Sequence, residues 1–341
     1  MSGALLDLHP REWPAWMVEQ GGKPFQGRIA ARWVFRRGAV AWQQMTDLPA
    51  ELRQSLAQRE PLCRAAVEAV SESEDGAAKL LLRYPDGAAA EAVIMPGTQG
   101  QTACLSTQVG CPVRCSFCAS GADGLERNLG TGEILEQALQ IRSQRGEFQR
   151  LVVMGMGDAG FNLEPTLAAL EALMDPEGGG MSPRRVTLST VAPRGVLDRI
   201  CEWGRKVSLA ISLHAPDDAL RAELVPGVGK RTIDETLSEA ERLFASRGRE
   251  YTLEYVLLEG VNDGPAQARA LSELLQGCRC HLNLIPYNQV PGLAYRRPAL
   301  LVQRAFAAVL EQAGHSVTLR RSLGASADAA CGQLRRRTLT C

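Results

Sequence analysis

The 341-residue sequence lacks any apolar run that approaches the roughly 18 residues needed for a membrane-spanning helix. It also lacks a basic start followed by an apolar segment, the pattern of a secretory signal. Lys plus Arg and Asp plus Glu both number 38, so no overall positive charge attracts nucleic acid. The glycine-bearing segments "GMGDAGFN" and "GVGKRT" lack the GxxxxGK[ST] pattern of a phosphate-binding loop. We therefore expect a cytoplasmic protein with no membrane association, in which any RNA binding relies on local basic patches.

The apolar content of 45% is sufficient for one large domain and a small one. Residues 1–62 predict a small helical domain, because "KPFQGRIAARWVFRRG" places apolar residues at helical spacing. Residues 63–96 hold three short strand-like runs separated by "EDG" and "PDG", which is typical of a β-meander.

Residues 97–325 repeat a strand-then-helix pattern six times, from "TACLSTQ" to "HLNLIP". A closed eight-unit barrel takes about 250 residues. The sequence therefore predicts an α/β fold, an incomplete (βα)6 barrel, followed by a tail at residues 326–341. A parallel sheet of this kind places its chemistry at the carboxyl ends of the strands.

Ten cysteines in a reducing compartment are not expected to form a disulfide framework. Cys111, Cys115 and Cys118 have C-x3-C-x2-C spacing in a loop after the first barrel strand. A structural zinc site needs four ligands, and no histidine or further cysteine occurs in the next 20 or so residues. Three thiolates instead suit a [4Fe–4S] cluster with one iron open to a ligand. We favour the cluster and keep zinc as the alternative.

The segment "CPVRCSFC" resembles the cluster motif of radical S-adenosylmethionine (SAM) enzymes. Further segments, among them "CLSTQVGC", "GLERNLGTGEI", "LAISLHAPDDALRAELVP" and "DAACGQL", resemble the RlmN/Cfr family of ribosomal RNA adenine methyltransferases along almost the whole chain. The resemblance implies a partial (βα)6 radical SAM barrel, an RNA-binding N-terminal domain and a tail that carries a methyl-accepting cysteine. It also implies a [4Fe–4S] cluster on the three cysteines and two equivalents of SAM per turnover.

The resemblance assigns roles to single residues. Cys331 would accept a methyl group from one SAM, and a radical from a second SAM would activate that methyl for addition to an adenine ring carbon. Cys104 would then form a disulfide with Cys331 to release the RNA, and Glu91 would accept a proton. Both thiols should need an activating environment, because a free cysteine has a pKa of about 8.5. The SAM pocket would comprise Gly157, Asp158, Ser189, Ser212, Leu213, His214 and Asn288.

One segment departs from the family pattern. Relatives mostly have Gly-Glu where this chain has Gly157-Asp158-Ala159-Gly160. The aspartate is one methylene shorter, and we expect Gly160 to let the backbone move toward the SAM amino group.

The expected partners are 23S ribosomal RNA, with transfer RNA as a further substrate, and a flavodoxin or ferredoxin as electron donor. Carbon 2 of adenine is the favoured target and carbon 8 the alternative. The basic N-terminal helices are the expected RNA surface, with Arg320, Arg321 and the Arg335–Arg337 run as further patches.

Two other functions stay open at this point. A radical SAM enzyme with another substrate, such as a protein maturase, would never methylate Cys331. A non-catalytic RNA-binding protein would hold zinc in place of iron and sulfide.

Overall fold

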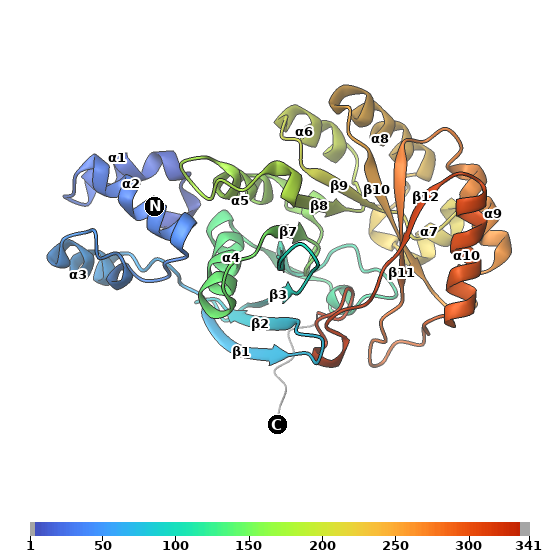
Figure 1. The fold of residues 1–341 in the computed structure, drawn as a ribbon, viewed down its shortest axis with the longest axis horizontal. Helices are drawn as coiled ribbons and strands as arrows, with labels where there is room; N and C mark the ends of the chain where they lie inside the picture. Colours follow the sequence, from blue (N-terminus) through green and yellow to red (C-terminus); the bar gives the residue numbers. More distant parts are fainter. Residues whose placement is uncertain (1–3, 335–341) are drawn as a thin grey trace.

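The computed structural model describes residues 4–334 and consists of one long mixed sheet with helices on its outer side (Figure 1). Ten strands form the sheet in the order β1-β2-β3-β4-β7-β8-β9-β10-β11-β12. Their bounds are Ala66–Glu72, Ala78–Arg83, Ala89–Met95, Thr102–Cys104, Arg150–Val153, Val186–Thr190, Ser208–Ser212, Tyr251–Leu257, Cys280–Pro286 and Ser316–Leu319. A separate hairpin pairs β5 (Gln108–Gly110) with β6 (Leu125–Asn128).

Ten α-helices accompany these strands in the described part of the chain. The N-terminal helices are α1 (Trp13–Glu19), α2 (Pro24–Arg37) and α3 (Ala50–Arg59). The barrel helices are α4 (Thr131–Arg145), α5 (Leu163–Met174), α6 (Val196–Trp203), α7 (Asp218–Leu224), α8 (Ile233–Arg247), α9 (Pro265–Leu274) and α10 (Leu300–Gln312). Within the described residues, no helix is both long enough and apolar enough to span a bilayer.

Within the ten-stranded sheet, the strands from β4 to β12 are all parallel, and at least one helix lies between each successive pair. Parallel neighbours need such crossovers, and the helices bury the outer face of the sheet. The predicted (βα)6 barrel is confirmed, with one addition. Strand β12 is a seventh parallel strand, whose Val317 pairs with Leu282 of β11.

The β-meander is not a separate layer beside the barrel. Strands β1, β2 and β3 pair antiparallel, and β3 then pairs antiparallel with β4 through Val93 and Cys104. The meander therefore extends the barrel sheet, and residues of β3 lie next to the first barrel strand.

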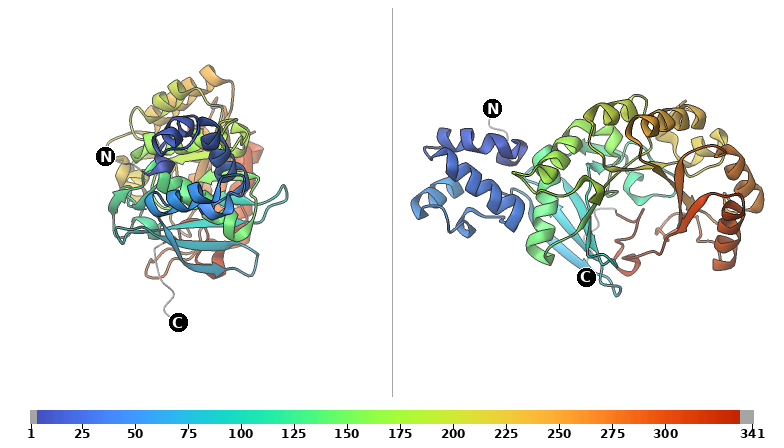
Figure 2. Two further views of the ribbon diagram at one scale, coloured as in Figure 1. Left: turned by 90° about the vertical axis from the view of Figure 1, so that its left-hand side faces the viewer. Right: turned by 45° about the horizontal axis from the view of Figure 1, so that its top comes forward.

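The N-terminal helices form a compact unit at one end of the molecule (Figure 2). Its core holds Trp13 against Phe35, with ring centroids 5.5 Å apart, and Trp16 stacked on Trp42. Arg36 of α2 donates hydrogen bonds of 2.8 and 2.7 Å to the carbonyls of Gly178 and Pro176, which follow α5. These bonds join the helical unit to the barrel.

The C-terminal tail returns to the turn between β1 and β2 (Figure 1). The Ser326 and Ser73 hydroxyls are 2.7 Å apart, and the Gly324 N–H donates a 2.6 Å hydrogen bond to Asp75. The tail then continues along the open side of the barrel to Leu334. Residues 335–341, which include the arginine run 335–337, lie outside the described residues.

Candidate active site

A cavity of about 210 Å³ opens at the carboxyl ends of the parallel strands. It is lined from the barrel, from the cysteine loop and from the tail, so segments more than 200 residues apart in sequence meet there. The predicted site residues that line it are Cys104, Cys111, Cys115, Cys118, Gly157, Asp158, Ser189, Ser212, His214, Asn288 and Cys331. Glu91 and Leu213 do not belong to the lining.

The cysteine loop is held on both sides by backbone hydrogen bonds. The Ser116 N–H donates to the Leu224 carbonyl at the end of α7, and the Gly227 N–H donates to the Val113 carbonyl at 2.8 Å. A Cβ atom on Gly227 would lie 2.3 Å from the Val113 Cα, so the close approach requires glycine. The loop is thereby fixed against the segment that follows α7.

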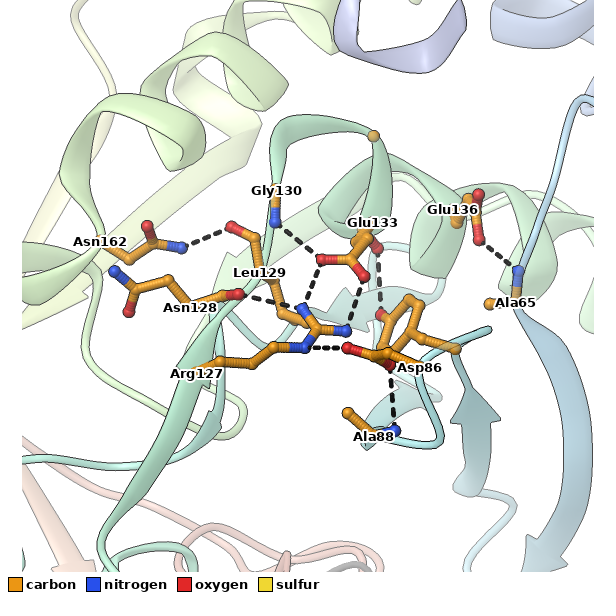
Figure 3. Close-up of polar contacts among 12 residues, drawn as sticks. Ala65, Asp86, Ala88, Arg127, Asn128, Leu129, Gly130, Glu133, Glu136 and Asn162 are labelled. Atoms are coloured by element: carbon orange, nitrogen blue, oxygen red, sulfur yellow. Dashed lines mark hydrogen bonds and ion pairs between the residues drawn. The ribbon is translucent and has the colours of Figure 1, made fainter. Parts of the chain in front are cut away.

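The β5–β6 hairpin frames the other side of the loop, and Arg127 anchors it (Figure 3). The Arg127 guanidinium contacts Asp86 in the β2–β3 turn at 2.6 Å and Glu133 of α4 at 2.8 Å. These two carboxylates raise the pKa of Arg127 above its usual value, and the hydrogen bond with Glu133 has the larger effect. Asn162 donates to the Leu129 carbonyl at 2.8 Å, which ties the end of the hairpin to α5.

The three sulfurs are not all within 4.8 Å of one another, so they are less tightly grouped than the ligands of one zinc ion. In tetrahedral zinc sites the Zn–S distance is about 2.3 Å, which places sulfur ligands about 3.8 Å apart. Among the described residues, His9, Glu171 and Asp175 form a group of possible metal ligands whose ligand atoms all lie within 4.8 Å of one another. The three cysteines do not form such a group. Three more widely separated thiols on one cavity wall suit a [4Fe–4S] cluster.

Burial raises the pKa of all three loop thiols, to about 12 for Cys111 and also upward for Cys115 and Cys118. The negative charge of neighbouring thiolates adds to the effect at Cys111 and Cys115. Iron–thiolate bonds remove this penalty, because the metal holds the sulfurs in their deprotonated form. The donor set therefore fits the cluster that the spacing predicts.

Cys104 and Cys331 both line the cavity, one from the barrel sheet and the other from the tail. Cys104 ends β4 and packs with Val93, Ala329 and Leu334, whereas Cys331 lies in the tail and stays exposed. Contrary to the expected activation, desolvation raises the pKa of both thiols, to about 12 for Cys104 and about 11 for Cys331. The charge of Arg320, which lines the same cavity, opposes the shift at both sulfurs.

The carboxylate of Asp158 accepts hydrogen bonds from other groups of the protein. Its Oδ1 accepts hydrogen bonds from the Gly160 N–H at 2.8 Å and the Thr190 hydroxyl at 2.7 Å, and its Oδ2 accepts from the Val191 N–H at 2.7 Å. Gly160 thus binds the carboxylate of Asp158 instead of carrying it toward a ligand. Only one acceptor position, on Oδ2, is left for a cofactor. The sequence had led us to expect that the whole carboxylate would face the cofactor.

The preceding Gly157 has a positive φ of 92°, and a Cβ there would lie 2.6 Å from the Gln108 side chain. Gln108 accepts a 2.9 Å hydrogen bond from the Asp158 N–H and donates one of 2.8 Å to Asn128. Glycine is therefore required for the chain to pass this close to the β5–β6 hairpin.

His214 is neutral in this site. Burial, with the nearby charge of Arg221, lowers its pKa from 6.5 to about 3. Its Nδ1 accepts a 3.2 Å hydrogen bond from the Val256 N–H, so the ring proton lies on Nε2. His214 can therefore act as a hydrogen-bond donor to a cofactor.

The neighbouring Leu213 packs its side chain in the main core, and only its backbone could contact a ligand.

Asn288 offers the cavity an acceptor. Its Nδ2 donates to the Cys331 carbonyl at 3.1 Å, and its Oδ1 is buried without a hydrogen-bond partner. An unpaired buried amide oxygen is costly unless a ligand donates to it. This atom supports a cofactor with donor groups, such as the amino, ribose or adenine N–H and O–H groups of SAM.

Sequence reasoning missed three charged residues around the site. Arg320 was expected in an RNA patch, but it lines the cavity and lies 3.6 Å from the Glu254 carboxylate. Glu254 is itself buried and lines the cavity. Lys79 forms a buried ion pair with Glu91. Contacts across a sheet depend on strand register, and no local pattern revealed them.

Comparisons with known proteins agree with this geometry. Residues 105–270 match the radical SAM superfamily, and residues 4–61 match the ribosomal RNA large subunit methyltransferase N-terminal domain. A protein of Rhodopirellula baltica named "Probable dual-specificity RNA methyltransferase RlmN" is 45% identical over 94% of this chain and 87% of its own length. A protein of the same name from Deinococcus deserti is 42% identical over 97% of this chain and 96% of its own length.

A solved radical SAM methyltransferase from Sphaerobacter thermophilus superposes with a TM-score of 0.94 at 38% identity, covering 98% of this chain and all of the other. Membership of the radical SAM superfamily implies a [4Fe–4S] cluster and SAM as cofactors. The chain belongs to the RlmN family of radical SAM methyltransferases.

Proposed function

We propose that this enzyme methylates a ring carbon of adenosine in RNA, with carbon 2 as the favoured position, through a methyl group carried on Cys331. The observation that carries the proposal is that Cys331 and Cys104 line the same cavity as the three-cysteine loop. RNA as substrate is supported by the names of the relatives and by the matching N-terminal domain. Within RNA we propose 23S ribosomal RNA and transfer RNA as the substrates, which places the activity in the cytoplasm.

The chemistry requires a carbon carrier because adenine ring carbons are electron-poor and resist an electrophilic methyl group. When bound, the cluster and SAM supply the methyl group and the radical that activates it. Cys331 loses its thiol proton as its sulfur takes the methyl group, and that carbon later bonds to the adenine ring. The RNA is then attached to the protein through the Cys331 sulfur.

Release of the RNA needs a second thiol and a base. The Cys104 thiolate attacks the Cys331 sulfur, forming a disulfide while the electrons of the sulfur–carbon bond stay with the carbon, which takes up a proton. Glu91 accepts the proton that leaves the ring carbon, and the single electron that the radical adduct must also lose would return to the cluster when it is bound. Glu91 lies on the same face of β3 as Val93 and Met95, which line the cavity, because side chains two residues apart share a face.

Within the N-terminal domain, the residues best placed to bind RNA lie on part of helix α2. Arg36 binds barrel carbonyls and Arg37 pairs with Asp47, whereas the exposed side chains of Arg28 and Arg32 make no hydrogen bond or ion pair within the described residues. Phe25, one turn before Arg28, is 48% exposed. An exposed aromatic ring beside two unpaired arginines suits base stacking and phosphate contacts.

The reducing electron would come from a flavodoxin or ferredoxin. The decisive test of the function is nucleoside mass spectrometry of ribosomal and transfer RNA from cells with and without this protein. We expect 2-methyladenosine to disappear from both RNAs when the protein is removed. Loss of 8-methyladenosine would reassign the carbon, and unchanged RNA would support a protein-modifying enzyme instead.

A further inference from the structure

We infer that Lys79 is a positioning residue that couples the base Glu91 to the tail that carries Cys331. The inference rests on the proposed role of Glu91 as proton acceptor. Lys79 lies on β2 and Glu91 on β3, and the Lys79 Nζ is 3.0 Å from the Glu91 Oε1. The same ammonium group donates a 3.2 Å hydrogen bond to the backbone carbonyl of Asp328 in the tail. One cation therefore contacts both the base and the tail segment.

The burial of this pair is unusual among the ion pairs of the protein. The Lys79 side chain is 6% exposed and that of Glu91 is 0% exposed, whereas most other pairs in the described part of the chain have at least one well-exposed partner. Taking two charges out of water costs several kcal/mol per ion, so a buried ion pair is often no more stable than an apolar pair of similar size. Leu80, Leu81 and Leu82 show that β2 accommodates apolar side chains. The stability of the fold alone therefore does not explain why a buried Lys79–Glu91 ion pair occurs here.

A role in proton transfer explains why the pair is charged. An isolated carboxyl group in such a buried position would hold its proton and could accept no other. The ammonium of Lys79 favours the carboxylate form, so Glu91 is ready to accept the proton of the ring carbon. Lys79 thereby acts through Glu91 and needs no contact with the substrate.

The contact with Asp328 links this base to Cys331, three residues further along the chain. Asp328 has a φ of 50°, a left-handed conformation that is uncommon for a residue other than glycine. With the tail docked, Lys79 divides its hydrogen bonds between Glu91 and the Asp328 carbonyl. When Glu91 takes up a proton, the carbonyl becomes the main partner of the cation. Proton uptake therefore strengthens the hold on the tail at the stage when Cys104 must reach Cys331.

A second contact offers a matched control for the tail alone. Ser326 binds Ser73 and also accepts a 3.2 Å hydrogen bond from the Glu74 N–H. The variant Ser326→Ala weakens tail docking on the same side of the sheet and leaves the Lys79–Glu91 pair intact.

The test measures two steps separately in the cluster-loaded full-length enzyme with Lys79→Met, Lys79→Arg and Ser326→Ala. The first step is methylation of Cys331 without RNA, followed by mass spectrometry. The second is the rate at which a covalent protein–RNA adduct resolves to free methylated RNA, followed on denaturing gels. Iron content and thermal melting check that each variant is folded.

We expect Lys79→Met to methylate Cys331 within about twofold of the wild-type rate but to resolve the adduct at least about tenfold more slowly, because base catalysis contributes on the order of 10²-fold or more. Lys79→Arg should recover most of the rate, and Ser326→Ala should resolve the adduct normally. Normal resolution by Lys79→Met would overturn the inference. Equal loss of both steps in Lys79→Met and Lys79→Arg would also overturn it, since it would show a structural role. Absence of Cys331 methylation in the wild-type enzyme would instead contradict the proposed function.

Discussion

The side-chain amide of Asn288, at the end of β11, donates a 3.1 Å hydrogen bond to the backbone carbonyl of Cys331. The same amide presents a buried, unpaired Oδ1. Asn288 therefore holds the tail with its nitrogen and is free to bind a cofactor with its oxygen. If SAM binds to this oxygen, as we propose, the position of Cys331 and the binding of SAM are linked through this one side chain.

The variant Asn288→Asp should lose both functions of the amide. A carboxylate oxygen would face the Cys331 carbonyl, and a donor bond worth about 1 kcal/mol would become a repulsion. We expect weaker SAM binding by equilibrium dialysis and at least about tenfold slower methylation of Cys331.

Gln333→Ala is the matched control, because it removes a neighbouring tail contact, the 2.8 Å bond to the Gln289 carbonyl, without changing Asn288. If both variants behaved alike, the link between Asn288 and the cofactor pocket would be wrong.

The variant Asp158→Ala should chiefly destabilise the fold. It removes the two oxygens that accept hydrogen bonds from Gly160, Thr190 and Val191, and it leaves the buried Val191 N–H and the partly buried Gly160 N–H unpaired. We expect a loss of about 2–4 kcal/mol in unfolding free energy, measured by denaturant titration with the cluster in place. Asp158→Asn keeps one acceptor oxygen and should lose about half as much. A change below about 0.5 kcal/mol for Asp158→Ala would show that the carboxylate is not structural.

The variant Cys104→Ala should trap the enzyme on its RNA. Without a thiol on β4, nothing can attack the Cys331 sulfur, and the sulfur–carbon bond to the RNA persists. Denaturing gels should show a covalent protein–RNA band that builds up to one equivalent. The half-buried Cys201, whose Sγ contacts Ser246, is away from the cavity lining, and Cys201→Ser should turn over normally. Free methylated RNA from Cys104→Ala would refute the resolving role.

The pH dependence of Cys331 reactivity follows from its raised pKa of about 11. Because the thiolate is the nucleophile, alkylation of Cys331 by iodoacetamide in the cluster-free protein should rise about tenfold per pH unit up to that pKa. The alkylation rate of a cysteine with an ordinary pKa of about 9 levels off near pH 9.

Arg320→Met should slow Cys331 alkylation further at each pH, because the arginine charge is what lowers this pKa. Peptide mapping by mass spectrometry gives the rate for Cys331 itself. A plateau below pH 9 would contradict the raised pKa of the Cys331 thiol.

Much of this architecture could be predicted because its signals are local. The spacing of Cys111, Cys115 and Cys118 predicts a cluster loop, and short β-branched runs followed by helical segments predict the barrel units. Strand β12 was missed because only four residues pair and their side chains alternate between exposed and half-buried, so no apolar run marks it. Its partner strand β11 has a buried face, and the apolar side chains of that face mark β11 in the sequence.

The charged contacts around the cavity could not be predicted in the same way. Asp158 was expected to face a ligand, but its direction is set by the backbone of Val191, the residue that follows strand β8. The pairing of Lys79 with Glu91 depends on the register of β2 and β3. Such contacts form between residues whose separation in sequence carries no periodic signal.

The central claim is that Cys331 carries the methyl carbon, and the most direct measurement is the mass of the peptide that contains Cys331. Cluster-loaded enzyme is incubated anaerobically with SAM and a reductant, digested with trypsin and analysed by mass spectrometry. We predict one added methyl group on Cys331, absent when Cys115 is replaced by serine. An unmodified Cys331 peptide in fully cluster-loaded enzyme would contradict the account.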